Sequence, residues 1–299
     1  MKHKFIYEGV EFDSDEFSKL SKTEQIHKLL PIAVDKNYGY SINFIENDFN
    51  KKKDLLKSLE FMEYCIPEVI PMNFSSLSQI SKELESVLNH SKYLAFTGFY
   101  KESIIELRSA LELSLIISMF YLMFDYKNKN IDELFKDMRK ATNESNKWFF
   151  SNSSTPSKGN FKEKGRKGTF GNFFYKQPCF KELIDNTPWE KDFNSIWNDI
   201  SNYTHSNGIF YMSINLSENY NFIPIFNKKS ISLYCNYLMK TLQLIGVIAV
   251  VSRPELINKE IADDFEHLGE PLIGSGLWGK ATEIFYKILP PEYLNYFKK

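Results

Sequence analysis

Apolar residues follow helical spacing over most of this chain. The segment 100–124 shows it best, because it begins amphipathic and becomes apolar on nearly every side. A helix with this pattern has other helices packed around its second half. Apolar residues three and four positions apart also mark helices at 75–90, 131–141, 189–203 and 230–252. The pattern therefore predicts an all-α fold, a helical bundle built around the segment 100–124.

The first residues have a different pattern. Aromatic and apolar residues alternate with polar ones from Phe5 to Phe12, which predicts a short strand or a hairpin with its turn at Glu8-Gly9. A helix is expected to open at Ser14, and Ser21 with Glu24 offers a capping box for the next one. We expect that helix to end at Pro31, because the residue before a proline avoids the α region. These small extended or β additions accompany the bundle.

Changes in composition divide the chain into parts. We predict a small N-terminal unit at 1–74, the helical bundle at 75–253 and a C-terminal helical tail at 254–299. The two longest apolar runs, 113–124 and 242–251, fall short of the roughly 18–20 residues that a membrane span needs, so we interpret both as core helices. In the last long helix we expect these residues to point inward: Leu233, Tyr237, Leu238, Leu242, Ile245, Ile248 and Ala249.

One ion pair stands out in the apolar segment 100–124. Arg108 and Glu112 are four residues apart, so they lie on one face of the helix. Charged side chains are rarely buried unless they are paired, and we therefore expect a fixed polar seam within the helical core. The polar stretch 202–206, which includes Tyr203 and His205, is the expected partner of this seam. A lone His beside Tyr and Thr is also compatible with a purely structural role.

The segment 143–178 forms an insertion in the bundle and is rich in Ser, Asn, Gly and Lys. Basic residues neutralise phosphates, and aromatic side chains, which are interleaved here, stack on unpaired bases. Two interpretations stay open: a nucleic-acid contact, or a solvated insertion whose Phe residues pack back on the body. The basic residues that would bind RNA are Lys158, Lys162, Lys164, Arg166 and Lys167.

The composition and the known short motifs exclude several classes of function. The net charge of −1 gives no global attraction to nucleic acid or membrane, so binding of either kind needs a local patch. The three cysteines are far apart and have no metal-ligand spacing, which favours reduced thiols in a cytoplasmic protein without a metal or other cofactor. The first residues lack the apolar region of a signal peptide. No metalloprotease, P-loop or serine-hydrolase motif occurs.

Two short motifs carry a resemblance to a known family. The stretch Arg108-Ser109-Ala110-Leu111-Glu112, a variable insertion, and the stretch Ser201–Ser206 ahead of another long helix resemble the HEPN superfamily of bacterial helical domains. The resemblance covers residues 75–252. It implies an up-and-down bundle of helices, a homodimer, and a role in phage defence or in a toxin–antitoxin system with an antitoxin or other protein partner. Many members are metal-independent endoribonucleases that act on RNA.

The chain departs from the family's catalytic motif, in which an Arg precedes the His by five to seven positions. Asn198, Asp199 and Ile200 occupy those positions before His205, and none of them carries a permanent positive charge. Arg108 is the candidate replacement from the facing helix. The resemblance thus implies Arg108, Glu112, Tyr203 and His205 as catalytic residues for acid–base and electrostatic catalysis. The alternative function is a non-catalytic interaction or dimerisation module.

Overall fold

In the computed structural model of the protein, the described residues are 4–47, 75–123, 174, 177–186, 189–204 and 223–252. Helix makes up 84% of them, and the extended structure among them is a small two-stranded sheet. The expected all-α fold with small β additions is therefore confirmed. The predicted helix at 131–141 and the C-terminal tail lie outside the described residues, and so does the insertion 143–178 apart from residues 174, 177 and 178.

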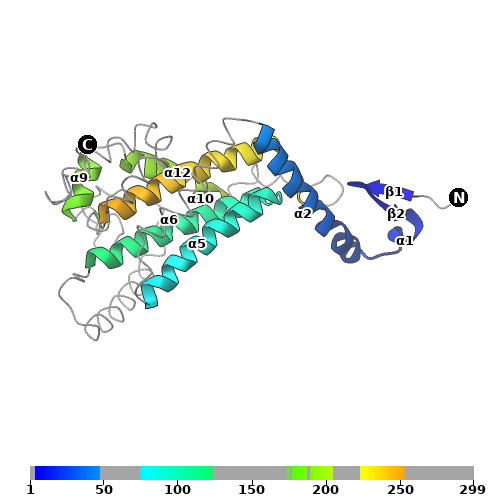
Figure 1. The fold of residues 1–299 in the computed structure, drawn as a ribbon, viewed down its shortest axis with the longest axis horizontal. Coiled ribbons are helices and arrows are strands. Elements are labelled where there is room, and N and C mark those ends of the chain that lie inside the picture. The colour runs from blue at the N-terminus through cyan, green and yellow to red at the C-terminus, as the bar shows by residue number, and fades with distance from the viewer. Residues whose placement is uncertain are drawn as a thin grey trace.

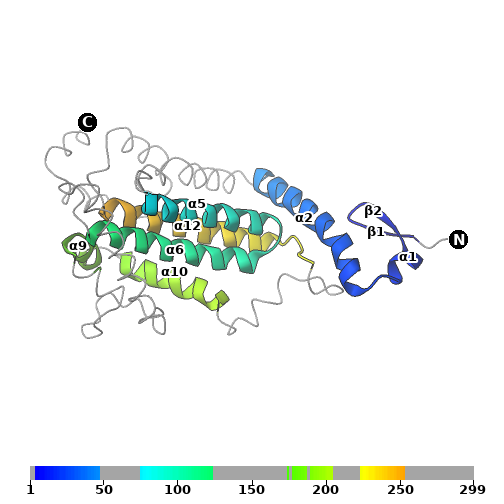
Figure 2. The ribbon, with the colours of Figure 1, turned by 90° about the horizontal axis from the view of Figure 1, so that it is seen from below.

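The bundle consists of long helices that lie side by side (Figures 1 and 2). They are α5 (Ser75–Phe96), α6 (Tyr100–Met123), α10 (Trp189–Thr204) and α12 (Lys228–Ser252). Helix α6 packs against each of the other three. Helices α5 and α10 run in one direction and α6 and α12 in the other, and the short helix α9 (Pro178–Asn186) lies at the end where α10 begins (Figure 2). This arrangement explains why α6 is apolar on almost every side.

The turn from α5 to α6 is closed by backbone hydrogen bonds. Gly98 has φ +95°, in the left-handed region, and its N–H donates to the carbonyl of Ala95 at 3.1 Å. The N–H of Phe99 donates to the carbonyl of Leu94 at 2.8 Å. A glycine with positive φ followed by such a bond is the usual way to end a helix, and it returns the chain directly along α5 as α6.

Helices α6 and α12 are parallel neighbours joined at both ends. At one end the backbone N–H of Asn227 donates to the hydroxyl of Tyr100 at 3.0 Å, and the Asn227 side chain caps α12 by accepting from the N–H groups of Lys229 and Ser230. At the other end the hydroxyls of Ser118 and Ser252 are hydrogen-bonded to each other. Burial raises the pKa of Tyr100 to about 12, so its hydroxyl stays protonated at this junction.

The inward face of α12 is formed by buried residues that include Tyr234, Leu238, Leu242, Ile245 and Ile248. The prediction that Leu233 points inward is wrong, because its side chain is exposed and the neighbouring Tyr234 takes the core position. Residues 228–249 of this helix are long and apolar enough to cross a membrane by length and composition alone, but 61% of the apolar window is buried inside the protein. In this structure α12 is a core helix of the bundle, as expected.

The N-terminal unit begins with the predicted hairpin. Strands β1 (Lys4–Tyr7) and β2 (Val10–Asp13) pair antiparallel, with Tyr7 opposite Val10. The two turn residues, Glu8 and Gly9, both have positive φ, at 49° and 83°. That combination is the type I′ turn, whose twist matches the twist of paired strands. The predicted turn at Glu8-Gly9 is therefore confirmed, and of the two expected forms the structure has the hairpin.

Two helices follow the hairpin. Asp13 caps the short α1 (Ser14–Ser18) by accepting from the N–H groups of Asp15 and Glu16. Ser21 and Glu24 then form the predicted capping box at the start of α2 (Lys22–Asn47): each side chain accepts a hydrogen bond from the backbone N–H of the other residue. Buried Phe17, Leu29 and Ala33 form a small core with Ile223, which belongs to the segment leading into α12.

The prediction that Pro31 ends this helix is wrong, because α2 continues unbroken through Pro31 to Asn47. A proline inside a helix removes the hydrogen bond to the carbonyl four residues earlier, here that of His27. Both Pro31 and His27 lie on the exposed face of α2. Water can therefore hydrate the free carbonyl, while the opposite face of the helix keeps its buried contacts.

Candidate functional site at the contact between α6 and α10

Arg108 and Glu112 form the predicted ion pair along α6. The Nε of Arg108 donates to Oε1 of Glu112 at 3.2 Å, and the two side chains are 14% and 31% exposed. The pair is therefore half-buried at the edge of the bundle. The expectation of a seam inside the core is therefore met only in part, because both side chains keep some exposure to solvent.

Helix α10 supplies a third side chain to this pair. The guanidinium carbon of Arg108 lies over the ring of Trp197, 5.1 Å from its centroid. This is cation–π range, and a guanidinium stacks well on an aromatic face. Trp197 is itself buried and stacked on Phe193, with centroids 5.7 Å apart and an interplanar angle of 19°. Trp197 and Glu112 together fix the orientation of the Arg108 guanidinium.

A run of aromatic rings holds α10 in place behind Trp197. Successive centroid distances are 4.7 Å from Phe174 to Phe180, 5.9 Å from Phe180 to Trp189 and 5.2 Å from Trp189 to Phe193. All of these rings are buried. Each aromatic contact adds about 0.5–1.5 kcal/mol beyond the area that it buries, so the run gives Trp197 a rigid support.

Glu112 is a residue of the site whose pKa is shifted from its ordinary value. Burial raises the pKa of its carboxyl above the ordinary value, and the neighbouring Arg108 only partly opposes this shift. Removing a carboxylate from water disfavours its charged form, whereas a nearby cation favours it. Glu112 therefore takes up a proton more readily than an exposed glutamate does.

The site also contains hydrogen-bond donors without partners. Within the described ranges, the terminal amino groups of Arg108 make no hydrogen bond or ion pair, since its contact with Glu112 uses Nε. The indole Nε1 of Trp197 and the hydroxyl of Ser201 are buried and likewise lack a partner there. Trp197 and Ser201 are four residues apart and so share a face of α10. Sequence reasoning missed Trp197 as part of the site, although it named Ser201 as the start of the second motif.

Tyr203 faces another helix. Its ring contacts Tyr237 of α12, with centroids 6.2 Å apart and an interplanar angle of 79°. Tyr203 lies six residues beyond Trp197, about 9 Å along the helix axis. The structure therefore brings Arg108 and Glu112 together with α10, but it packs Tyr203 against α12. His205 and the basic residues Lys158, Lys162, Lys164, Arg166 and Lys167 lie outside the described residues.

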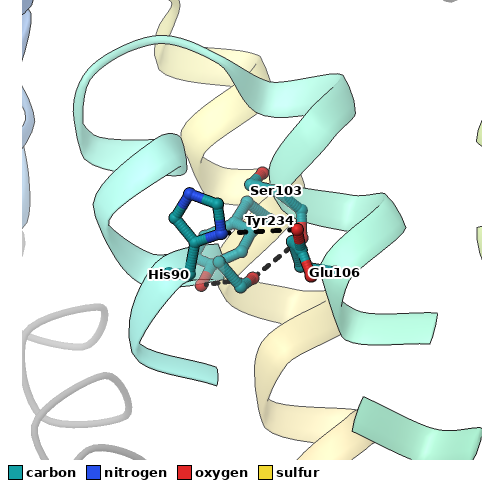
Figure 3. Close-up of polar contacts among 5 residues, drawn as sticks. His90, Ser103, Glu106 and Tyr234 are labelled. Carbon is teal, nitrogen blue, oxygen red and sulfur yellow. Dashed lines mark hydrogen bonds and ion pairs between the residues drawn. The ribbon is translucent and has the colours of Figure 1, made fainter. Parts of the chain in front are cut away.

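A second polar cluster connects α5 with α6 and α12 (Figure 3). His90 on α5 lies with its Nδ1 3.4 Å from Oε1 of Glu106 on α6, and its side chain is mostly exposed. The hydroxyl of the next residue on α5, Ser91, donates to the carbonyl of Ser103 at 2.8 Å and lies 3.1 Å from the hydroxyl of Tyr234. Tyr234 is fully buried, which raises the pKa of its hydroxyl. This cluster fastens three helices together.

No group of three or more metal-ligating side chains occurs within the described part of the chain. Comparisons with protein-family models, with curated proteins and with solved structures find no match for this chain.

Proposed function

We propose that this protein acts on or binds RNA as a HEPN-like protein of phage defence or of a toxin–antitoxin system. The observation that carries the proposal is the contact of Arg108 with α10. The two motifs on which the resemblance rests lie on α6 and at the end of α10, and these two helices pack directly together.

The half-buried Arg108 supports this function in chemical terms. Cleavage of RNA through the ribose 2′-hydroxyl needs an acid–base group and a cation that stabilises charge on the phosphate. His205 is the candidate acid–base group, and it follows directly on the last residue of α10, Thr204. Arg108 is the candidate cation, since the positions five to seven residues before His205 carry no arginine.

RNA cleavage without metal is the direct test. We would incubate the purified protein in EDTA with a single-stranded and a structured RNA, and follow both cleavage and retention of the RNA in a gel. We expect retention of the RNA in either case, and cleavage that His205→Ala abolishes if the protein is an endoribonuclease. Retention without cleavage would identify a binding protein.

The chain offers a matched control in His90→Ala. His90 is a mostly exposed histidine on α5, paired with Glu106 and outside the proposed site. Its removal should leave cleavage and retention as in the wild-type protein. If the wild-type protein neither retains nor cleaves RNA at ordinary salt, the proposal fails, and the interaction or dimerisation module becomes the better account.

A further inference from the structure

The guanidinium of Arg108 is prepared for a ligand that binds in its plane. Its face lies over Trp197 and its Nε is bound by Glu112, so both its position and its rotation are fixed. The two terminal amino groups, which form the outer edge of the guanidinium, have no partner within the described part of the chain. An arginine held in this way presents a planar fork of donors that matches two oxygens of a phosphate or carboxylate.

We propose that the contact between α6 and α10 is an oxyanion site that binds a phosphate group through the terminal amino groups of Arg108, with Trp197 and Glu112 as the residues that position the guanidinium. The inference rests on the proposed function in naming the phosphodiester of RNA as the natural ligand. The chemistry of the site fits any phosphate, so free phosphate and a mononucleotide are alternative sources of the same group.

Glu112 has two opposing effects on the binding of an anion at this site. Its carboxylate orients Arg108, but its negative charge repels an anion that binds to the same guanidinium. A glutamine at this position keeps an oxygen for the Nε of Arg108 and removes the charge. Two changes within one ion pair should thus affect phosphate affinity in opposite directions, a result that a purely structural pair would not produce.

The test uses the full chain labelled with ¹⁵N and follows the indole N–H signals by NMR. The signal of Trp197 is identified by its loss in Trp197→Phe. Inorganic phosphate, a mononucleotide and a short single-stranded oligoribonucleotide are titrated separately. We expect a saturable shift of the Trp197 signal when phosphate is added to the wild-type protein. Arg108→Lys keeps the charge but loses the planar fork of donors, so it should bind phosphate about tenfold more weakly. Glu112→Gln should bind phosphate more tightly. Lys101→Ala, a change of one positive charge on the same helix, should leave the affinity unchanged.

Each outcome decides a different claim. A Trp197 signal that none of the three probes moves, or a shift that Arg108→Lys and Glu112→Gln leave unchanged, overturns the oxyanion site. RNA cleavage or retention in that case still supports the proposed function. A phosphate-dependent shift in a protein that neither retains nor cleaves RNA upholds the site and overturns RNA as its ligand. Circular dichroism of each variant establishes that the comparison is made between folded proteins.

Discussion

The backbone of Gly98 lies directly against the side-chain amide of Asn37, so close that a Cβ at Gly98 would stand 2.8 Å from Nδ2 of Asn37. Asn37 projects from α2, and Gly98 lies in the turn between α5 and α6. The amide donates to the carbonyls of Thr97 and Pro224 at 3.1 and 2.9 Å and accepts from the N–H of Phe226 at 2.9 Å. One buried asparagine thus joins the N-terminal unit to two segments at one end of the bundle.

Gly98→Ala should destabilise the protein. The new Cβ would meet both Asn37 and Pro224, and alanine at φ +95° is strained in any case. We expect a loss of about 1–3 kcal/mol in the free energy of unfolding, measured by urea denaturation. Gly39→Ala is the matched control, because Gly39 lies inside α2 and a Cβ there meets nothing within 4 Å. That change should be neutral or stabilising by up to about 1 kcal/mol, and equal effects of the two changes would contradict the packing described here.

Asn37→Ala should cost more than an ordinary surface substitution. It removes three hydrogen bonds at once and leaves buried backbone groups without partners. Because each such group costs about 1–3 kcal/mol, we expect a total loss of about 2–4 kcal/mol after local relaxation. Asn43→Ala, on the exposed face of the same helix, should change the stability by less than about 0.5 kcal/mol. A small effect of Asn37→Ala would show that water replaces the amide easily, and that α2 is only loosely attached.

Local signals in the sequence predicted local structure well. The Glu8-Gly9 turn, the Ser21–Glu24 capping box and the amphipathic α5 and α10 each depend on a few neighbouring residues, and each is found as expected. The errors arose where burial decides the outcome. The pattern predicts a helix end at Pro31, but Pro31 and His27 both lie on the exposed face of α2, where a proline is tolerable. Periodicity alone cannot tell Leu233 from the adjacent Tyr234, so the pattern wrongly predicts that Leu233 points inward.

The candidate site could be predicted only in part. The i, i+4 spacing of Arg108 and Glu112 was enough to predict their pairing, since both lie on α6. The contact of Arg108 with Trp197 depends on how α10 packs against α6, and no local pattern encodes that contact. An arginine in an apolar helix does signal that some partner is needed. Only the folded chain identifies that partner as an aromatic ring and places Tyr203 against α12 instead.

Arg108 and Trp197 should be energetically coupled. Arg108→Ala removes the ion pair and the cation–π contact, and we expect it to lower the free energy of unfolding by about 1–3 kcal/mol. Trp197→Leu keeps an apolar side chain on α10 but removes the ring. The double variant should be more stable than the sum of the single changes predicts, by about 0.5–2 kcal/mol of coupling. Additive effects in urea denaturation would show that the guanidinium gains nothing from the ring.

Glu112 should make stability depend on pH in a definite direction. Because its pKa is raised in the folded protein, the folded state binds the proton more tightly than the unfolded state. The resulting stabilisation is fully present below the ordinary pKa of glutamate and is lost as the pH rises through the raised value. Glu112→Gln resembles the protonated form at every pH, so its stability relative to the wild-type protein should increase between pH 4.5 and pH 7.

Urea denaturation over this range, with Glu102→Gln on the same helix as the control for loss of a carboxylate, measures the effect of Glu112. A relative stability of Glu112→Gln that falls toward neutral pH would mean that the attraction of Arg108 outweighs burial.

The basic cluster of the insertion should control RNA affinity more than His205 does. Affinity for a phosphate backbone comes from accumulated positive charge, and each phosphate contact on a single strand contributes roughly 0.7 to the slope of log K against log salt. Changing Lys162, Lys164, Arg166 and Lys167 to Ser should therefore weaken RNA binding and flatten its salt dependence. His205 carries at most one partial charge near neutral pH, so His205→Ala should leave the RNA affinity and its salt dependence nearly unchanged.

The matched control for this experiment changes four surface lysines of α5 and α12, namely Lys82, Lys92, Lys228 and Lys229, to Ser. It alters the net charge equally but leaves the insertion intact. A wild-type salt slope for the insertion variant would assign the RNA affinity to another surface. An equal loss of affinity in both variants would assign it to overall charge, because the insertion would then contribute no more than any four cations. The solvated-insertion interpretation would then be preferred, because a local patch is needed to bind RNA in a protein whose net charge is −1.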